Sequence, residues 1–364
     1  MNPFRILALG GDGIGPEVLD AGLKVAHVAA GQAGIKLIVE QDLLHGAAWD
    51  AYGTFCREET VALAKSSDAV LVGAVGGPKW DKIRVPGGPE LQDGLMRLRK
   101  ELDTYVGLRP SKSSEALLDS TPFAQGRVEG ADILVLREMC GGVMFAEPRG
   151  LIEQSGDRYG FDTAGYRASE VERIAHAAFA LARNRRGNLI SADKANVMES
   201  YKLWRSVFEE VSKLYPDVEF QHLSADNAAY QMMMRPRDFD VIVGCNLLGD
   251  LLSDLAAVVA GGLGMLPSAC LAGLPWTGAK GLYEPVHGSA PDLAGTGKAN
   301  PVSMILSVAM MFEHGLRRQD VALRIENAVA TAIDRGHRTA DIGGTNTTNE
   351  IMQAILAALA EAEE

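Results

Sequence analysis

Short apolar runs alternate with amphipathic stretches over the first hundred residues. Strand-like runs cover 5–9, 36–40 and 69–74, and helical patterns follow Pro16 and cover 57–65. This alternation is typical of a mostly parallel sheet covered by helices. The N-terminal part of the chain is therefore predicted to be α/β.

The pattern changes after residue 104. Strand-like runs at 105–109, 133–137, 143–147 and 158–163 follow one another, with no obvious helix between the last of them, which indicates an antiparallel arrangement. A helix is then predicted to begin at Ser169, where Ser169 and Glu172 form a capping box. Further strands are expected at 189–192 and 241–245, and helices at 301–314, 321–332 and 350–360.

These changes of pattern predict two domains, since 364 residues exceed the usual size of one. The chain is expected to cross between them near Asp103 and again near Ala260. One domain then comprises 1–103 together with 260–364, and the other comprises 104–259.

Composition excludes several kinds of protein. The chain is 47% hydrophobic and carries a net charge of −12, so it is globular and should repel nucleic acid and anionic membranes. The segment 255–279 has no charged residue, but its glycines and prolines would break a membrane-spanning helix. It is predicted to be a buried helix end followed by an interior loop.

Four scattered cysteines favour neither a zinc site nor a disulfide framework. The N-terminal residues lack the apolar stretch and cleavage site of a signal peptide. A cytoplasmic protein with reduced thiols is therefore expected.

A glycine-rich turn at 10–16 follows the first strand and opens a helix. Pro16 occupies the last glycine position of the G-x-G-x-x-G dinucleotide fingerprint, so the turn is not the Rossmann motif. It fits either a phosphate-binding turn or a tight turn with proline at the first helical position.

Asp250 and Asp254 stand four residues apart, on one face of a predicted helix. Adjacent carboxylates in an apolar setting repel each other and lose hydration, which a divalent cation offsets. Asp226 is a candidate third oxygen ligand. The alternative is a pair of solvated carboxylates or a helix cap.

Lys194 follows a predicted strand directly, and a lysine near a cation loses its proton readily enough to act as a general base. Arg99, Arg109 and Arg137 occur among apolar residues, where guanidinium groups bind carboxylates through paired hydrogen bonds. A surface lysine and structural ion pairs are the alternatives. The loop 284–292, including His287, offers backbone amides that could wrap a nucleotide.

Six motifs in the same order resemble those of the β-decarboxylating dehydrogenases, and the isopropylmalate branch of that family is the most similar. They are GDGIGPE from Gly11, GAVGGPKW from Gly73, LMRLRK from Leu95, DKANV from Asp193, GDLLSD from Gly249 and EPVHGSAPD from Glu284. The resemblance spans essentially the whole chain. It implies two α/β domains that share a large mixed sheet, unlike the Rossmann fold.

The resemblance also implies a homodimer with shared active sites, and NAD with Mg²⁺ or Mn²⁺ as cofactors. Lys194 and Asp226 would reach the partner's site as catalytic residues, and Asp226, Asp250 and Asp254 would hold the metal. Asp292 would favour NAD over NADP. Substrate would contact Arg99, Arg109, Arg137, Leu95, Met96 and Asp226, and the cofactor would contact Ile14, Gly76, Gly77, Glu284, His287, Gly288, Ser289, Ala290, Asp292, Leu293 and Asn300.

Two positions depart from the family pattern. Met144 stands where the family has the tyrosine that protonates the enol, and a thioether cannot donate that proton. The helix before Leu95 has its acidic residue displaced, which leaves Leu95 and Met96 to line the alkyl pocket.

The implied reaction is the NAD-dependent oxidative decarboxylation of a 3-substituted malate, with conversion of 3-isopropylmalate to 4-methyl-2-oxopentanoate in leucine biosynthesis as the leading hypothesis. The alternatives are a sibling enzyme for another 3-alkyl- or 3-aryl-malate, malate, tartrate or homoisocitrate, a dehydrogenase that decarboxylates poorly, and a non-catalytic regulatory subunit.

Overall fold

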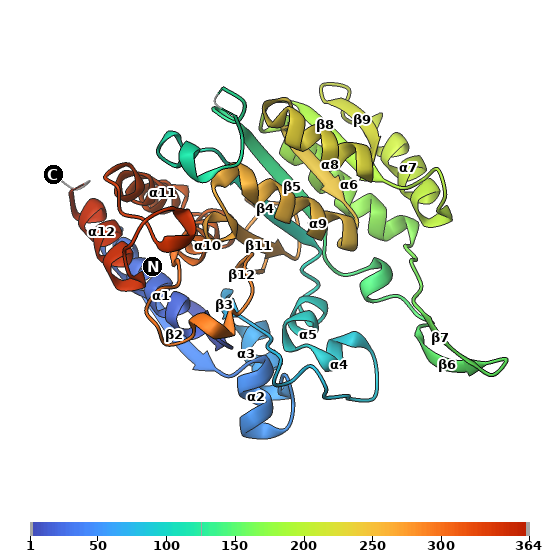
Figure 1. Ribbon diagram of the computed structural model, residues 1–364, viewed down its shortest axis with the longest axis horizontal. Coiled ribbons are helices and arrows are strands. Elements are labelled where there is room, and N and C mark those ends of the chain that lie inside the picture. The colour runs from blue at the N-terminus through green and yellow to red at the C-terminus, as the bar shows by residue number, and fades with distance from the viewer. Residues whose placement is uncertain (1–2, 125, 362–364) are drawn as a thin grey trace.

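One mixed sheet of ten strands runs through the computed structural model, which describes residues 3–124 and 126–361 (Figure 1). The strand order is β2-β1-β3-β12-β11-β4-β5-β10-β8-β9. This confirms the predicted α/β fold with a large mixed sheet. The strands are β1 (Phe4–Gly11), β2 (Leu37–Asp42), β3 (Ala69–Ala74), β4 (Val106–Lys112), β5 (Asp132–Glu138), β8 (Asn188–Asp193), β9 (Glu219–Ser224), β10 (Val241–Gly244), β11 (Pro267–Leu271) and β12 (Gly281–Pro285).

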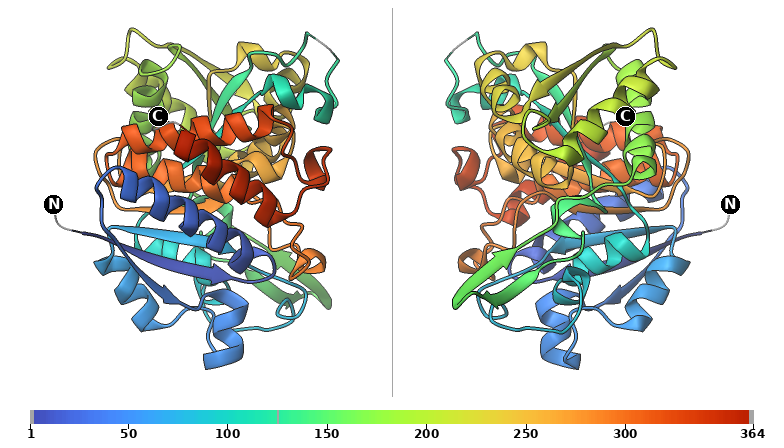
Figure 2. Two further views of the ribbon diagram at one scale, coloured as in Figure 1. Left: turned by 90° about the vertical axis from the view of Figure 1, so that its left-hand side faces the viewer. Right: turned by 90° about the vertical axis from the view of Figure 1, so that its right-hand side faces the viewer.

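Helices cover both faces of the sheet (Figures 1 and 2). Four of them pack together beside β3, β11 and β12, and another group accompanies β5, β8 and β10. The first group is α1 (Gly15–Gln32), α10 (Val302–Met310), α11 (Gln319–Asp334) and α12 (Thr348–Glu361), and the second is α6 (Ala168–Arg183), α7 (Glu199–Ser212), α8 (Ala225–Met234) and α9 (Asn246–Ala257). The remaining helices are α2 (His45–Tyr52), α3 (Glu58–Ser66), α4 (Pro89–Gln92) and α5 (Gly94–Glu101).

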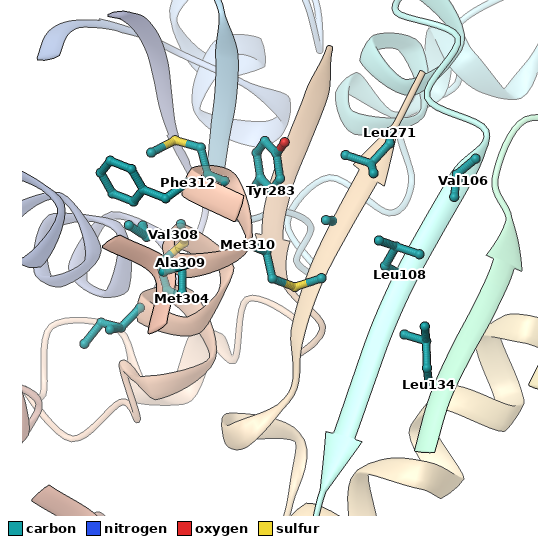
Figure 3. Close-up of a cluster of buried hydrophobic side chains, with 14 of the residues drawn as sticks. Val106, Leu108, Leu134, Leu271, Tyr283, Met304, Val308, Ala309, Met310 and Phe312 are labelled. Atoms are coloured by element: carbon teal, nitrogen blue, oxygen red, sulfur yellow. The ribbon is translucent and has the colours of Figure 1, made fainter. Parts of the chain in front are cut away.

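The largest core cluster lies between the α10 layer and the central strands (Figure 3). Met304, Val308 and Met310 of α10 are buried there, with Leu108 of β4 and Leu271 of β11. Because α10 is apolar around most of its circumference, it is an interior helix. This packing joins strands from distant parts of the chain into a single sheet.

The antiparallel arrangement of the middle segment is confirmed, but the strands that form it differ from those predicted. β4 pairs antiparallel with β5, and β6 (Gly150–Gln154) pairs with β7 (Asp157–Phe161) in a separate hairpin that projects from the body (Figure 1). The strand expected at 143–147 is wrong. Gly142, at φ 70°, turns the chain into a 3-10 turn in which the amides of Phe145 and Ala146 both donate to the Gly142 carbonyl.

Three smaller predictions also need correction. The capping box of α6 forms two residues earlier than expected, where Glu170 accepts from the backbone N–H of Arg167 at 2.7 Å. The segment 255–279 does contain a helix end, but it continues into the buried strand β11 rather than a loop. β12 was not predicted, because its apolar run is too short to be distinguished by periodicity, and it includes the first two residues of the loop predicted at 284–292.

Within residues 3–124 and 126–361, no helix is both long and apolar enough to cross a membrane. The four cysteines are free thiols, three of them buried.

Candidate active site

Two arginines from neighbouring strands meet at a helix carboxylate. Arg137 of β5 is opposite Gly107 of β4, so Arg109, two residues further along β4, shares its face of the sheet. The Arg109 guanidinium donates to Asp250 Oδ1 at 2.9 Å and to Ser253 Oγ at 2.6 Å, and Arg137 donates to the same Asp250 oxygen. Burial would raise the pKa of Asp250, but Arg137 and Arg109 outweigh it and lower that pKa.

Asn246, the first residue of α9, clamps Arg137 from the other side. Its Oδ1 accepts from Arg137 Nε at 3.0 Å and from Nη2 at 2.7 Å, while its Nδ2 donates to the Gly141 carbonyl at 3.1 Å. Its backbone N–H also donates to the Tyr166 hydroxyl at 3.0 Å. The Arg137 guanidinium is therefore fixed in direction by its neighbours.

Met144 lies against the same guanidinium. Its Sδ is 3.4 Å from Arg137 Nη2, and its carbonyl accepts from Arg149 at 2.8 Å. The side chain predicted to replace the family tyrosine therefore borders the arginine cluster, and its thioether has no proton to donate there.

Asp250 and Asp254 lie one turn apart on α9, as the spacing predicted. Partial burial and then the charge of Asp250 raise the pKa of Asp254, which has no hydrogen-bond or ion-pair partner within residues 3–124 and 126–361. The second oxygen of Asp250 is likewise without a bond there. These hard oxygen ligands and their mutual repulsion fit a divalent cation.

Asp226 does not join this pair within one chain. It lies in the first turn of α8, where Lys194 Nζ donates to its Oδ1 at 2.7 Å and thereby lowers its pKa. Among the residues that the structure describes, no group of three His, Cys, Asp or Glu side chains could hold a metal ion. Lys194 and Asp226 therefore form a separate pair at the ends of β8 and β9, in which Asp226 is exposed and Lys194 is half-buried.

Arg99 is paired with Glu284, so a predicted substrate ligand contacts a predicted cofactor ligand. Burial disfavours the charge of Arg99, but Glu284 outweighs this effect and raises its pKa. On the same helix, α5, Leu95 is buried and Met96 is half-buried. The Asp93 carboxylate caps that helix by accepting from the amides of both.

The glycine-rich turn is joined to two other loops. Ile14 N–H donates to the Ser289 carbonyl at 2.8 Å, and Ser289 Oγ donates to the Gly76 carbonyl at 2.8 Å. Gly13, at φ 58°, approaches so closely that a Cβ would stand 2.0 Å from the Ser289 oxygen. The predicted cofactor residues of the loops near 14, 76 and 289 therefore form one cradle.

Asp12 links the loop of Gly76 in this cradle to the start of α2. Its buried carboxylate accepts from the amide of Gly76 at 2.8 Å, from those of Gly46 and Ala47 at 3.1 and 2.8 Å, and bonds His45 Nδ1 at 2.9 Å. The negative charge thus meets the N-terminus of α2.

The remaining predicted cofactor residues lie along the loop that leaves β12. His287 Nε2 is buried without a partner among the described residues, and burial lowers the pKa of this histidine. Such an orphan polar atom fits a ligand. Asn300 already has partners within the protein. Its Nδ2 donates to Asp341 Oδ2 at 3.0 Å, and its Oδ1 accepts from the backbone N–H of Val302, the first residue of α10, at 3.0 Å. The others lie close by in sequence: Gly77 follows Gly76, and Gly288, Ala290, Asp292 and Leu293 flank Ser289.

Sequence reasoning missed two residues that organise the site. Asp12 lies inside the GDGIGPE motif, and Asn246 lies three residues before GDLLSD. Their position in or beside a motif was the only feature of the sequence that could have identified them. Their roles depend on contacts with residues distant in sequence, which spacing does not reveal.

Similarity to known proteins identifies the family of this chain. The family model described as isocitrate/isopropylmalate dehydrogenase matches residues 5–355. A 3-isopropylmalate dehydrogenase from Zymomonas mobilis is 48% identical, over 98% of this chain and 100% of its own, and one from Aquifex aeolicus is 46% identical, over 94% and 92%. The crystal structure of isocitrate dehydrogenase from Methylococcus capsulatus has a TM-score of 0.85 at 31% identity, covering 98% of this chain and 99% of that one. The chain therefore belongs to the isocitrate/isopropylmalate dehydrogenase family.

Proposed function

We propose that the protein catalyses the oxidative decarboxylation of 3-isopropylmalate to 4-methyl-2-oxopentanoate, the reaction of leucine biosynthesis. The observation that carries the proposal is the cluster of Arg109, Arg137 and Asp250, with Asp254 one turn away, in a chain 48% identical to a 3-isopropylmalate dehydrogenase. Two fixed guanidinium groups match the two carboxylates of a malate.

Each residue has a defined part in this reaction. Arg109 and Arg137 bind the carboxylates, and Lys194 accepts the proton of the hydroxyl. Leu95 and Met96 offer an apolar surface to the branched substituent. When bound, NAD supplies the hydride acceptor, and Mg²⁺ or Mn²⁺ at Asp250 and Asp254 supplies a Lewis acid that favours loss of CO₂. The cofactor is assigned to the cradle formed by Ile14, Gly76, Gly77, Ser289 and the loop 284–293, with Arg99 supporting Glu284 at its edge.

We further propose that the active enzyme is a homodimer in which Lys194 and Asp226 act in the partner's site. One chain keeps that pair apart from the carboxylates of α9. The hairpin β6–β7 and the helices α8 and α9 expose large apolar side chains that a second copy would cover. They include Leu151 at 81% exposure, Tyr230 at 60% and Leu251 at 56%.

The domain division follows from the same proposal. Residues 1–103 with 260–364 would bind the cofactor, and residues 104–259 would bind substrate and metal and form the dimer. The free cysteines suit the reducing environment of the cytoplasm, where we place the enzyme.

Turnover of purified protein with NAD⁺ and Mn²⁺ over a panel of 3-substituted malates tests the proposal. The highest kcat/KM is expected with 3-isopropylmalate, together with release of CO₂. A strong preference for another member of the panel would instead favour the sibling specificity, which Met144 motivates. Inactivity of a dimeric, correctly folded preparation on every substrate would favour the regulatory subunit.

A further inference from the structure

A cavity of about 510 Å³ lies behind the strand that carries Arg109. Arg109 and Ser111 point toward α9, where Ser111 Oγ donates to the Ala256 carbonyl at 2.6 Å. Pro110 and Lys112 alternate with them and line the cavity on the opposite face of the sheet. Its volume is within the range of small-molecule sites.

The walls of the cavity come from separate parts of the chain. Pro110 and Lys112 belong to β4 and Glu326 belongs to α11, whereas the floor includes Met310 of α10 and Val329 of α11. Figure 3 shows Met310 extending from α10 toward β11. A molecule bound here would contact both the strand of the arginine cluster and the helix layer of the other proposed domain.

The cavity lining combines two opposite charges with an apolar floor. Lys112 of β4 and Glu326 of α11 both line it with exposed side chains, and neither forms an ion pair or hydrogen bond within residues 3–124 and 126–361. Loss of hydration and the charge of Glu313 raise the pKa of Glu326, whereas the charge of Lys112 lowers it. Each of these two side chains would therefore be stabilised by a ligand group of opposite charge.

The rest of the rim is acidic. Glu115 and Asp334 add negative charge, while Asp132 is already paired with Arg185 at 2.8 Å. The rim therefore favours a ligand with a cationic group near Glu326, and Lys112 remains as the single cation of the lining for an anionic group.

We propose that this cavity binds an apolar α-amino acid as a zwitterion. Its ammonium group would pair with Glu326, its carboxylate with Lys112, and its side chain would lie on the floor formed by Leu306, Met310 and Val329. An α-amino acid carries both charges next to an aliphatic chain, which is the combination that the walls and floor complement. Because the ligand contacts β4 behind Arg109, its binding is expected to change the KM for the malate substrate.

Titration calorimetry of the intact enzyme with leucine, valine and methionine tests this proposal. Isoamylamine and 4-methylpentanoate each keep the aliphatic chain of leucine but lack one of its charged groups. Both are expected to bind at least about tenfold more weakly than leucine, since each leaves one wall unpaired. Equal binding of either analogue, or no binding of any amino acid, would overturn the proposal.

Variants locate the binding. Glu326→Gln and Lys112→Gln should each weaken leucine binding about tenfold or more, and Ala330→Phe should block the cavity without changing charge. Glu219→Gln, on the edge strand β9, and Lys213→Gln, at the end of α7, are matched controls that should bind leucine normally. Basal kcat/KM without amino acid reports the proposed function separately. Binding that survives in Glu326→Gln and Lys112→Gln, or that simply competes with the malate, contradicts a site in this cavity.

Discussion

Removal of the Asn246 side chain tests whether the clamp on Arg137 positions substrate. Asn246→Ala deletes the two hydrogen bonds to Arg137 Nε and Nη2, at 3.0 and 2.7 Å, and the one to the Gly141 carbonyl. The ion pair between Arg137 and Asp250 remains. The guanidinium therefore stays in the site but loses its fixed orientation.

The size of the effect follows from these bonds. A hydrogen bond to a charged group contributes about 1.5–3 kcal/mol, and truncation also leaves buried donors unpaired. Because water and Asp250 recover part of this loss, we expect kcat/KM to fall about 10- to 100-fold, or roughly 1.4–2.7 kcal/mol. Most of the fall should appear in KM, since a carboxylate clamp binds substrate and transition state alike.

Steady-state kinetics of Asn246→Ala, Asn246→Asp and Arg137→Lys provide the measurement. Asn246→Asp keeps an acceptor oxygen for Arg137 and should recover most of the activity. In an Arg137→Lys background, Asn246→Ala should have much less effect, because the two residues act as a unit. An unchanged KM in Asn246→Ala, or fully additive losses in the double variant, would refute the positioning role.

Three other predictions concern separate parts of the molecule. Met144→Tyr should raise the rate of CO₂ release relative to NADH formation, because it places a phenol beside Arg137; no gain would indicate a pocket built around another acid or another substrate. Asp254→Asn should weaken Mn²⁺ binding in calorimetry by at least tenfold, and unchanged affinity would contradict its assignment as a ligand. Burial lowers the pKa of His314 below 6.5, so below that pH the unfolded chain takes up a proton that the folded chain does not, and stability falls. The Tm of His314→Phe should therefore decline less between pH 6.5 and 5 than that of the unmodified protein, and parallel declines would contradict this account.

Local pattern predicted much of the fold. The alternation of β1, α1 and β2 and the amphipathic helix α6 were readable because their apolar residues follow strand or helix periods along long segments. β11 and β12 were missed, because short buried strands have no alternating polar face. The error at 143–147 came from an apolar run whose preceding glycine, Gly142, redirects the backbone.

The candidate site was only partly readable from the chain. The spacing of Asp250 and Asp254 predicted their shared helix face, and Arg109 was a candidate from its apolar setting. That Arg109 and Arg137 converge on Asp250 depends on the register of β4 against β5. Sequence spacing does not determine such a register, and the same reasoning explains why Asn246 and Asp12 were missed.

The pairing of β3 with β12 has a consequence for synthesis of the protein. Ala69 of β3 pairs with Gly281 of β12, and the Ser289 carbonyl accepts from Ile14 in the glycine-rich turn. Strands that are synthesised early therefore complete their pairing only after later strands have been synthesised. Until the ribosome has released residues near 290, one edge of β3 stays unpaired, and the cradle lacks the loop that contains Ser289. An unpaired edge of this kind invites association with other chains. Nascent chains stalled before residue 281 should therefore depend more strongly on chaperones than those released after it.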